Sequence, residues 1–140
     1  MQKLPIKDVK RALILSIAFY ICTLAVGLFV SIFVEPALTG SPLFRQINWI
    51  ISVAISLGFI IPFTRWYLES PKVKNRSREA LYFGALIIIS SFVLDLLIAI
   101  PLIRANSFAL FLFYYLNVEY FSFIAITLLT TGYLGRTSQK

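Results

Sequence analysis

The chain has 140 residues, of which 59% are hydrophobic and only 14% are charged. A soluble domain has roughly a quarter of its residues charged, so this composition predicts a surface that faces lipid. The net charge of +7 does not indicate nucleic-acid binding, because the basic residues lie between apolar runs and form no separate patch. With no histidine and one cysteine, the chain has almost no ligands for zinc or haem and no base for a nucleophilic triad. We therefore expect no enzymatic activity, no metal site and no cofactor.

Four apolar stretches follow one another, at about residues 11–34, 44–66, 80–103 and 110–134. Each has about twenty or more residues, and a helix of that length crosses a hydrocarbon core about 30 Å thick. The first stretch is longer than the apolar part of a signal peptide, so we interpret it as a retained span. The sequence thus predicts an all-α fold: a polytopic membrane protein with a single domain, residues 1–140, built as a bundle of four transmembrane helices. In the polar hairpin before the third stretch, Asn75 or Ser77 is the expected helix cap.

The basic residues predict the orientation of the bundle. Of the 13 lysines and arginines, all but Arg45 and Arg104 belong to the N-terminal segment, the middle hairpin and the C-terminal tail. This asymmetry predicts that both termini are cytoplasmic. The hairpin also forms a cytoplasmic basic loop, which is either a contact for anionic lipid headgroups or a docking site for a partner. Its basic residues are Lys72, Lys74, Arg76 and Arg78.

Small and polar residues recur at helical spacing along each stretch. They are Ser16, Tyr20, Thr23, Gly27 and Ser31 in the first, Asn48, Ser52 and Ser56 in the second, Gly84, Ser91 and Asp95 in the third, and Tyr115, Glu119, Ser122 and Thr130 in the fourth. Two interpretations stay open. The stripes either pack the helices against one another or line a water-filled path.

Asp95 and Glu119 are the exceptional members of these stripes. At a rise of ~1.5 Å per residue, both lie about 12–14 Å below the outer face of the bundle. A carboxylate at the bilayer centre costs about 2.5–3.5 kcal/mol, and no lysine or arginine of the sequence lies at that depth. The acids are therefore protonated, share one proton as a coupled pair, or bond to a tyrosine hydroxyl or a polar side chain. The polar candidates are Asn48, Asn117, Ser52 and Ser91.

Two prolines are hinge candidates within the apolar stretches. Pro101 frees the carbonyl of Leu97, and Pro62 has the same effect in the second stretch. Transporters often have such helix breaks near a binding site, although prolines are also common where a helix leaves the bilayer.

The second half of the chain resembles a family of small four-span proteins of bacterial and archaeal membranes. The family pattern has an Arg-Glu-x-Leu-x-x-Gly start to the third span, a Leu-Asp pair within it, and a tyrosine followed by a late glycine in the fourth. The matching positions here are Arg78, Glu79, Leu81, Gly84, Leu94, Asp95, Tyr120 and Gly132. The resemblance implies the membrane class, with the chain in a prokaryotic cytoplasmic (inner) membrane, and it draws attention to Asp95. It implies no activity, because the family has none assigned.

Two hypotheses for function follow. The first is a non-enzymatic integral membrane protein, an accessory factor or subunit that binds a membrane partner through its small-residue stripes. The second is a proton-coupled transporter or channel-like homo-oligomer that uses Asp95 and Glu119. Under the first hypothesis the two acids are structural clasps, and under the second they exchange protons.

Overall fold

The computed structural model describes residues 8–34, 43–99 and 118–138. These residues form α1 (Val9–Phe33), α3 (Phe44–Leu68), α4 (Arg76–Leu94) and α7 (Val118–Thr137). A π-helical turn, η1 (Asp95–Ala99), continues α4. No strand occurs within the described ranges, so the predicted all-α class is confirmed.

Local caps explain where two of these helices begin. The side chain of Asp8 accepts a hydrogen bond from the Arg11 amide before α1, and that of Asn75 accepts one from the Arg78 amide before α4. Of the two caps expected from the sequence, Asn75 is therefore the cap of α4, and the helix begins at Arg76, four residues before the apolar stretch itself. The third and fourth stretches also extend, by prediction, into residues 100–117, which lie outside the described residues.

Three helical segments are long and apolar enough to cross a membrane. They are Val9–Val30, Gln46–Leu68 and Arg76–Ile98. The membrane class predicted from composition is therefore supported by the helices themselves. The α7 helix is not among these three segments, so a fourth span stays a prediction.

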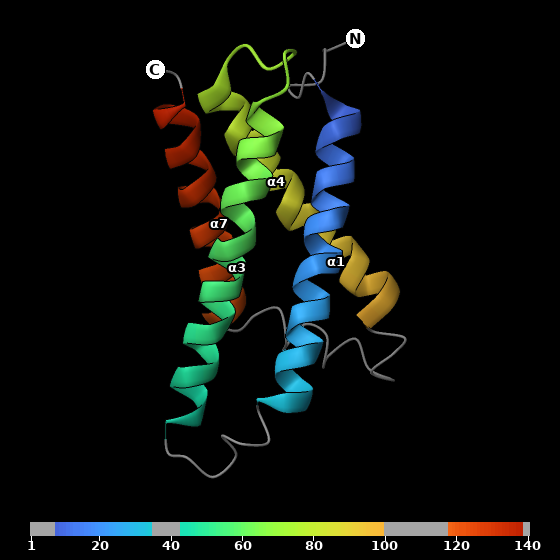
Figure 1. The fold of residues 1–140 in the computed structure, drawn as a ribbon, viewed down its shortest axis with the longest axis vertical. Helices are drawn as coiled ribbons and strands as arrows, with labels where there is room; N and C mark the ends of the chain where they lie inside the picture. Colours follow the sequence, from blue (N-terminus) through green and yellow to red (C-terminus); the bar gives the residue numbers. More distant parts are fainter. Residues whose placement is uncertain (1–7, 35–42, 100–117, 139–140) are drawn as a thin grey trace.

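The helices form an elongated bundle in which α4 crosses the others obliquely (Figure 1). The α4 helix packs against α7, α1 and α3, and α3 also packs against α7 and α1. The start of α1, the α3–α4 connection and the end of α7 lie at the same end, which we call the basic end. Its described lysines and arginines are Lys10, Arg11, Arg65, Lys72, Lys74, Arg76, Arg78 and Arg136.

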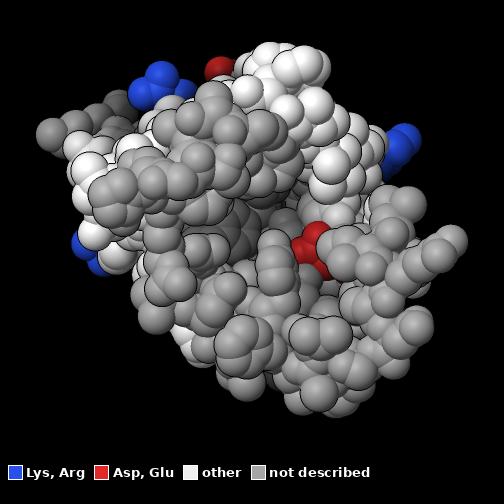
Figure 2. All heavy atoms as spheres, turned by 90° about the horizontal axis from the view of Figure 1, so that it is seen from below, with Lys and Arg blue, Asp and Glu red and all other residues white. Residues whose placement is uncertain are grey.

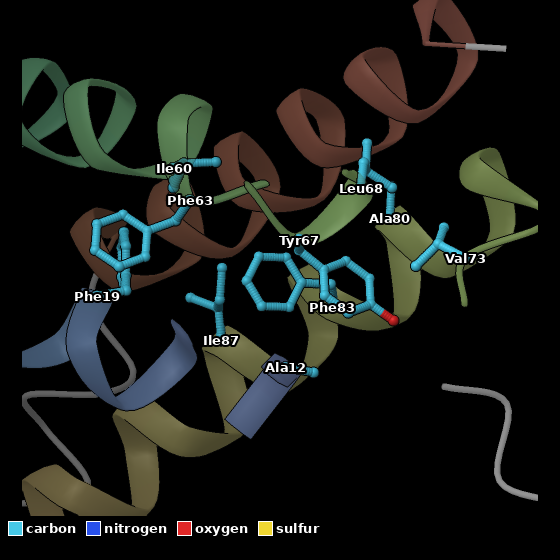
Figure 3. Close-up of a cluster of buried hydrophobic side chains, with 10 residues drawn as sticks. All are labelled: Ala12, Phe19, Ile60, Phe63, Tyr67, Leu68, Val73, Ala80, Phe83 and Ile87. Carbon is cyan, nitrogen blue, oxygen red and sulfur yellow. The ribbon is translucent and has the colours of Figure 1, made fainter. Parts of the chain in front are cut away.

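A cluster of buried apolar side chains joins α1, α3 and α4 in the half of the bundle nearer the basic end (Figure 3). Its members are Ala12, Phe19, Ile60, Phe63, Tyr67, Leu68, Val73, Ala80, Phe83 and Ile87. The ring of Phe19 meets that of Phe63 edge to face, with the centroids 6.1 Å apart. Many other large apolar side chains are exposed, among them Phe29, Ile32 and Leu129, as expected for surfaces that face lipid.

Small residues let α4 and α7 approach closely along what we call the α4–α7 seam, formed by Ala80, Leu81 and Gly84 of α4 and Thr131, Gly132 and Gly135 of α7. A Cβ atom added at Gly135 would meet the Ala80 Cβ at 2.7 Å, and one added at Gly84 would overlap the Thr131 hydroxyl. Gly84 therefore packs helices, as one interpretation of the stripes has it. Gly27 has nothing within 4 Å of the corresponding position, so the stripe on α1 makes no such approach there.

Candidate functional site

Asp95 and Tyr20 form a polar contact between α4 and α1 within the membrane-spanning part of the bundle. The Tyr20 hydroxyl of α1 donates a hydrogen bond of 2.7 Å to the Asp95 carboxyl group, at the end of α4. Tyr20 is buried, whereas Asp95 is only partly buried. Of the partners expected for the acids from the sequence, a tyrosine hydroxyl is therefore found for Asp95.

A second polar contact joins the same two helices, α1 and α4, one turn nearer the basic end. The hydroxyls of Ser16 and Ser90 lie 3.1 Å apart. Ser16 precedes Tyr20 by one helical turn, so the stripe on α1 presents both polar groups to α4. These two polar contacts fix the rotation and the axial position of α1 relative to α4, because a polar side chain left without a partner in an apolar environment costs free energy.

The helix geometry changes at the acid. Asp95 is the first residue of η1, and a π-turn lengthens each hydrogen-bonded step by one residue relative to an α-helix. Such turns occur frequently at functional sites. The hinge candidate Pro101 lies outside the described residues, whereas Pro62 lies within α3, which stays helical to Leu68.

The remaining site candidates are placed as follows. Ser91 is buried one turn before Asp95 on the same helix. Ser52 is exposed, and its hydroxyl donates to the backbone carbonyl of Asn48, one turn earlier in α3, at 2.9 Å. Asn117 lies outside the described residues.

Glu119 belongs to the first turn of α7, but its side chain is outside the described part of the structure. The next residue, Tyr120, is partly buried and lies near enough to Asp95 for the two groups to interact electrostatically. The start of α7 therefore reaches the neighbourhood of Asp95, and a contact between the two acids stays a prediction. Seen from the end of the bundle opposite to the basic end, one group of acidic atoms is visible away from the edge of the molecule, whereas the lysine and arginine atoms that show, and one further acidic group, lie at the edge (Figure 2).

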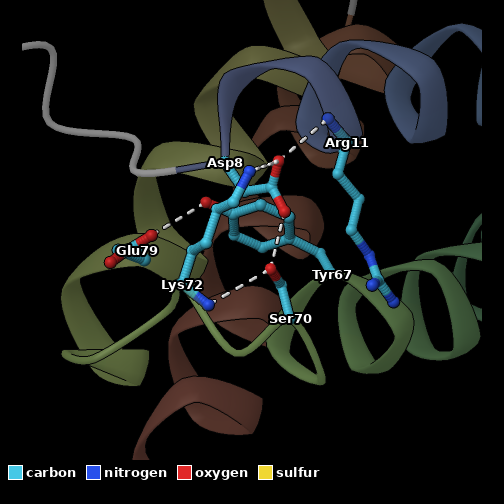
Figure 4. Close-up of polar contacts among 6 residues, drawn as sticks. All are labelled: Asp8, Arg11, Tyr67, Ser70, Lys72 and Glu79. Carbon is cyan, nitrogen blue, oxygen red and sulfur yellow. Dashed lines mark hydrogen bonds and ion pairs between the residues drawn. The ribbon is translucent and has the colours of Figure 1, made fainter.

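A second polar cluster, at the basic end, was not predicted from the sequence (Figure 4). Asp8 accepts a hydrogen bond of 2.6 Å from the Ser70 hydroxyl, and its carboxylate lies 3.9 Å from the Lys72 ammonium. The Ser70 hydrogen bond is the main reason why the pKa of Asp8 is lowered from its ordinary value of 3.8, and Lys72 and Arg11 add to this effect. The Arg11 guanidinium donates to the Trp66 carbonyl. The start of α1 is thus tied to the end of α3 and to the loop that follows it.

Glu79 is the other acid that sequence reasoning did not single out for a structural or chemical role. It is 3% exposed, and its carboxylate accepts a hydrogen bond of 3.0 Å from the Tyr67 hydroxyl. The Tyr67 ring stacks on Phe83 with the centroids 4.6 Å apart. The charge-rich sequence around Glu79 suggests an exposed hairpin. The sequence signal that could indicate this contact is a tyrosine in the last turn of α3, followed shortly by an acid near the start of α4.

Two further hydroxyls are buried without a hydrogen-bond partner among the described residues: those of Thr64 on α3 and Thr127 on α7. Both residues are fully buried. A buried hydroxyl of this kind usually binds an ordered water.

The chemistry open to this arrangement is the holding or exchange of protons by carboxyl–tyrosine pairs. Among the described residues, no three histidine, cysteine, aspartate or glutamate side chains gather closely enough to hold a metal ion. Of the four residues predicted to form a basic loop, Lys72 and Lys74 lie in the α3–α4 connection, whereas Arg76 and Arg78 belong to the first turn of α4, because the cap at Asn75 starts the helix there. All four residues are exposed.

Comparison with protein-family models, with curated proteins and with solved structures finds no match. The proposals below therefore rest on residues and geometry.

Proposed function

We propose that the protein is a non-enzymatic, multi-pass protein of a prokaryotic cytoplasmic membrane that serves as an accessory factor or subunit of a larger membrane assembly. The observation that carries this proposal is that polar groups within the bundle join its own helices. Tyr20 bonds to Asp95, Ser16 lies against Ser90, and Tyr67 bonds to Glu79. Such contacts hold the helices of the bundle in one arrangement. A protein that acts by binding other proteins needs a fixed surface of this kind.

In this proposal α7 is the fourth span and both termini are cytoplasmic. Support comes from the α4–α7 seam, which aligns α7 with a helix that is long and apolar enough to cross the membrane. The basic end supports the orientation, because lysines and arginines are retained on the cytoplasmic side.

The test of the accessory role is extraction of the protein, at its natural expression level, into lipid nanodiscs cut directly from the source membrane. We expect a particle that contains a second protein in fixed proportion through two unrelated purification steps. An unrelated four-span protein with the same affinity tag is the control for nonspecific capture. A particle that contains only copies of this chain would contradict the accessory role.

A second candidate function is supported by one specific observation: Asp95 is only partly buried and lies where α4 becomes π-helical. This candidate is a proton-coupled transporter or channel-like homo-oligomer that uses Asp95 and Glu119. A single four-helix bundle encloses little volume, so transport requires several copies.

Infrared titration of the carboxyl groups in nanodiscs separates the two functions. The variants Asp95→Asn and Glu119→Gln assign the bands. The accessory role predicts that both groups keep one protonation state between about pH 5 and 8. Titration within that range, together with a pH-gradient-driven flux in vesicles that Asp95→Asn abolishes, would replace the accessory role by transport.

A further inference from the structure

The outer side of the α4–α7 seam brings two arginines together. Leu81 of α4 packs over Gly132 of α7, where an added Cβ would lie 3.1 Å from the Leu81 side chain. Leu81 is 44% exposed, so this contact faces the surroundings of the bundle and not its core. It therefore marks one line along the surface where the two helices meet.

Arg78 and Arg136 both lie one turn from that contact, in the same direction. The helices run antiparallel, so a step back from Leu81 to Arg78 and a step forward from Gly132 to Arg136 both lead toward the basic end. Each step is about 4.5–6 Å along the helix axis. On α4, Arg78 shares the outer face with Leu81, and on α7, Arg136 shares it with Gly132. Both arginines thus lie beside the same stretch of the seam.

Among the described residues, neither arginine forms an ion pair with an acid. Glu79 is next to Arg78 in sequence, but its side chain is buried on the other face of α4, against Tyr67. The described part of α7 after Glu119 contains no aspartate or glutamate. Arg78 is also held in place, since its Nε donates a hydrogen bond of 3.1 Å to the Tyr82 hydroxyl.

Apolar side chains lie on the other side of the Leu81–Gly132 contact, deeper in the bundle. Leu129, one turn before Gly132 on α7, is 73% exposed. A molecule that binds here therefore meets cations toward the basic end and leucines toward the middle of the bundle. Guanidinium groups bind phosphate through paired hydrogen bonds, and leucines pack against hydrocarbon chains.

We propose that the outer side of the α4–α7 seam binds one anionic phospholipid, with its phosphate between Arg78 and Arg136 and an acyl chain along Leu81 and Leu129. Free phosphate would bind to the arginines alone. An acidic protein segment would bind to the arginines but would make no favourable contact with the exposed leucines at this depth. The site is more specific than general attraction of a basic loop to a charged membrane, because the loop lysines are not part of it. It depends on the membrane location of the protein and not on the accessory role.

Native mass spectrometry of the full chain in detergent tests the site, with dioleoylphosphatidylglycerol and dioleoylphosphatidylcholine as probes. We expect the first phosphatidylglycerol to bind more tightly than phosphatidylcholine. The Arg78→Gln/Arg136→Gln variant should weaken it roughly thirtyfold, at about five- to sixfold per arginine. The matched control is Lys10→Gln/Arg65→Gln, which removes the same charge from exposed residues of α1 and α3 at the basic end and should leave the first affinity nearly unchanged.

Three results would overturn the proposal. Equal losses in the two double variants would mean that only net charge attracts the lipid. Equal affinity for both lipids would mean that the site does not recognise an anionic headgroup. Displacement of phosphatidylglycerol by inorganic phosphate at equal concentration would mean that the leucines contribute nothing. The variants Arg78→Lys and Tyr82→Phe, which keep the charge, provide a second test, and each should weaken binding by a few-fold. Arg78→Lys removes the planar guanidinium group, and Tyr82→Phe removes the hydroxyl that holds this group in place.

Discussion

Replacement of Gly135 by alanine tests the close approach of α4 and α7. The new methyl group would lie 2.7 Å from the Ala80 Cβ, 2.8 Å from the Arg76 carbonyl oxygen and 2.9 Å from the Ser77 Cα. Two of these atoms belong to the backbone, so no side-chain rotation relieves the overlap. The helices must instead move apart.

The magnitude follows from two opposing effects. Overpacking of a well-packed interface costs about 1–3 kcal/mol, whereas alanine is better than glycine in a helix interior by about 1 kcal/mol. We expect the Gly135→Ala variant to be less stable by about 0–2 kcal/mol. The control is Gly27→Ala, where nothing lies within 4 Å of the new atom, and which should be more stable by up to about 1 kcal/mol. The difference between the variants isolates the packing effect, because both carry the same gain in helix propensity.

Reversible unfolding in mixed micelles, followed by circular dichroism, measures both free energies of unfolding. Gly58→Ala is a second control, since Gly58 also has nothing within 4 Å. If Gly135→Ala is as stable as the two controls, the α4–α7 seam is not packed as described, and the position inferred for Arg136 next to Arg78 loses its basis.

Three further predictions concern the polar contacts. In a double-mutant cycle, Tyr20→Phe and Asp95→Leu should show a coupling of about 0.6 kcal/mol, and no more than about 1.7 kcal/mol, in the free energy of unfolding; these are the average and the largest values for hydrogen bonds between membrane helices. A coupling of zero would mean that the bond contributes no stability. Tyr67→Phe keeps the stacked ring but removes the donor to buried Glu79, so the free energy of unfolding should fall by about 1–3 kcal/mol, and an unchanged midpoint would contradict this. Because the folded protein lowers the pKa of Asp8 below 3.8, this carboxylate contributes its full stability above that pH and loses it as the pH falls through the lower folded-state value. The free energy of unfolding, measured from about pH 5 to pH 2, should therefore decline more steeply in the natural chain than in Asp8→Asn, and parallel curves would argue against the effect.

Much of the architecture follows from the sequence because lipid imposes simple requirements. Long apolar stretches must be helical in a membrane, where every backbone polar group needs a partner. The helix cap at Asn75 also follows from local chemistry. The spacing of Ser16 and Tyr20 predicts a common face, although it does not predict which helix that face meets.

The parts that the sequence leaves open depend on rotation about helix axes and on long-range pairing. Depth along the helix suggests a contact between Asp95 and Glu119, which stays a prediction. Depth alone does not indicate the hydrogen bond that Asp95 accepts from Tyr20, 75 positions earlier in the chain. Glu79 looks like an exposed charge in a polar hairpin, yet Tyr67 makes its burial tolerable. The π-turn at Asp95 has no local sequence pattern that predicts it.

The contacts at the basic end also bear on the order in which the bundle is assembled. The bond between Asp8 and Ser70 joins residues 62 positions apart, and so does the bond from the Arg76 guanidinium to the Ser138 carbonyl. During synthesis the first cannot form until α3 has left the ribosome, and the second must await the end of α7. The bond at the start of α1 can therefore form once α3 is in place, whereas the bond at the start of α4 must wait for the whole of α7. A mutation at Ser70 or Arg76 should accordingly leave insertion intact and increase the lifetime of the loosely assembled bundle, the form in which membrane proteases find their substrates.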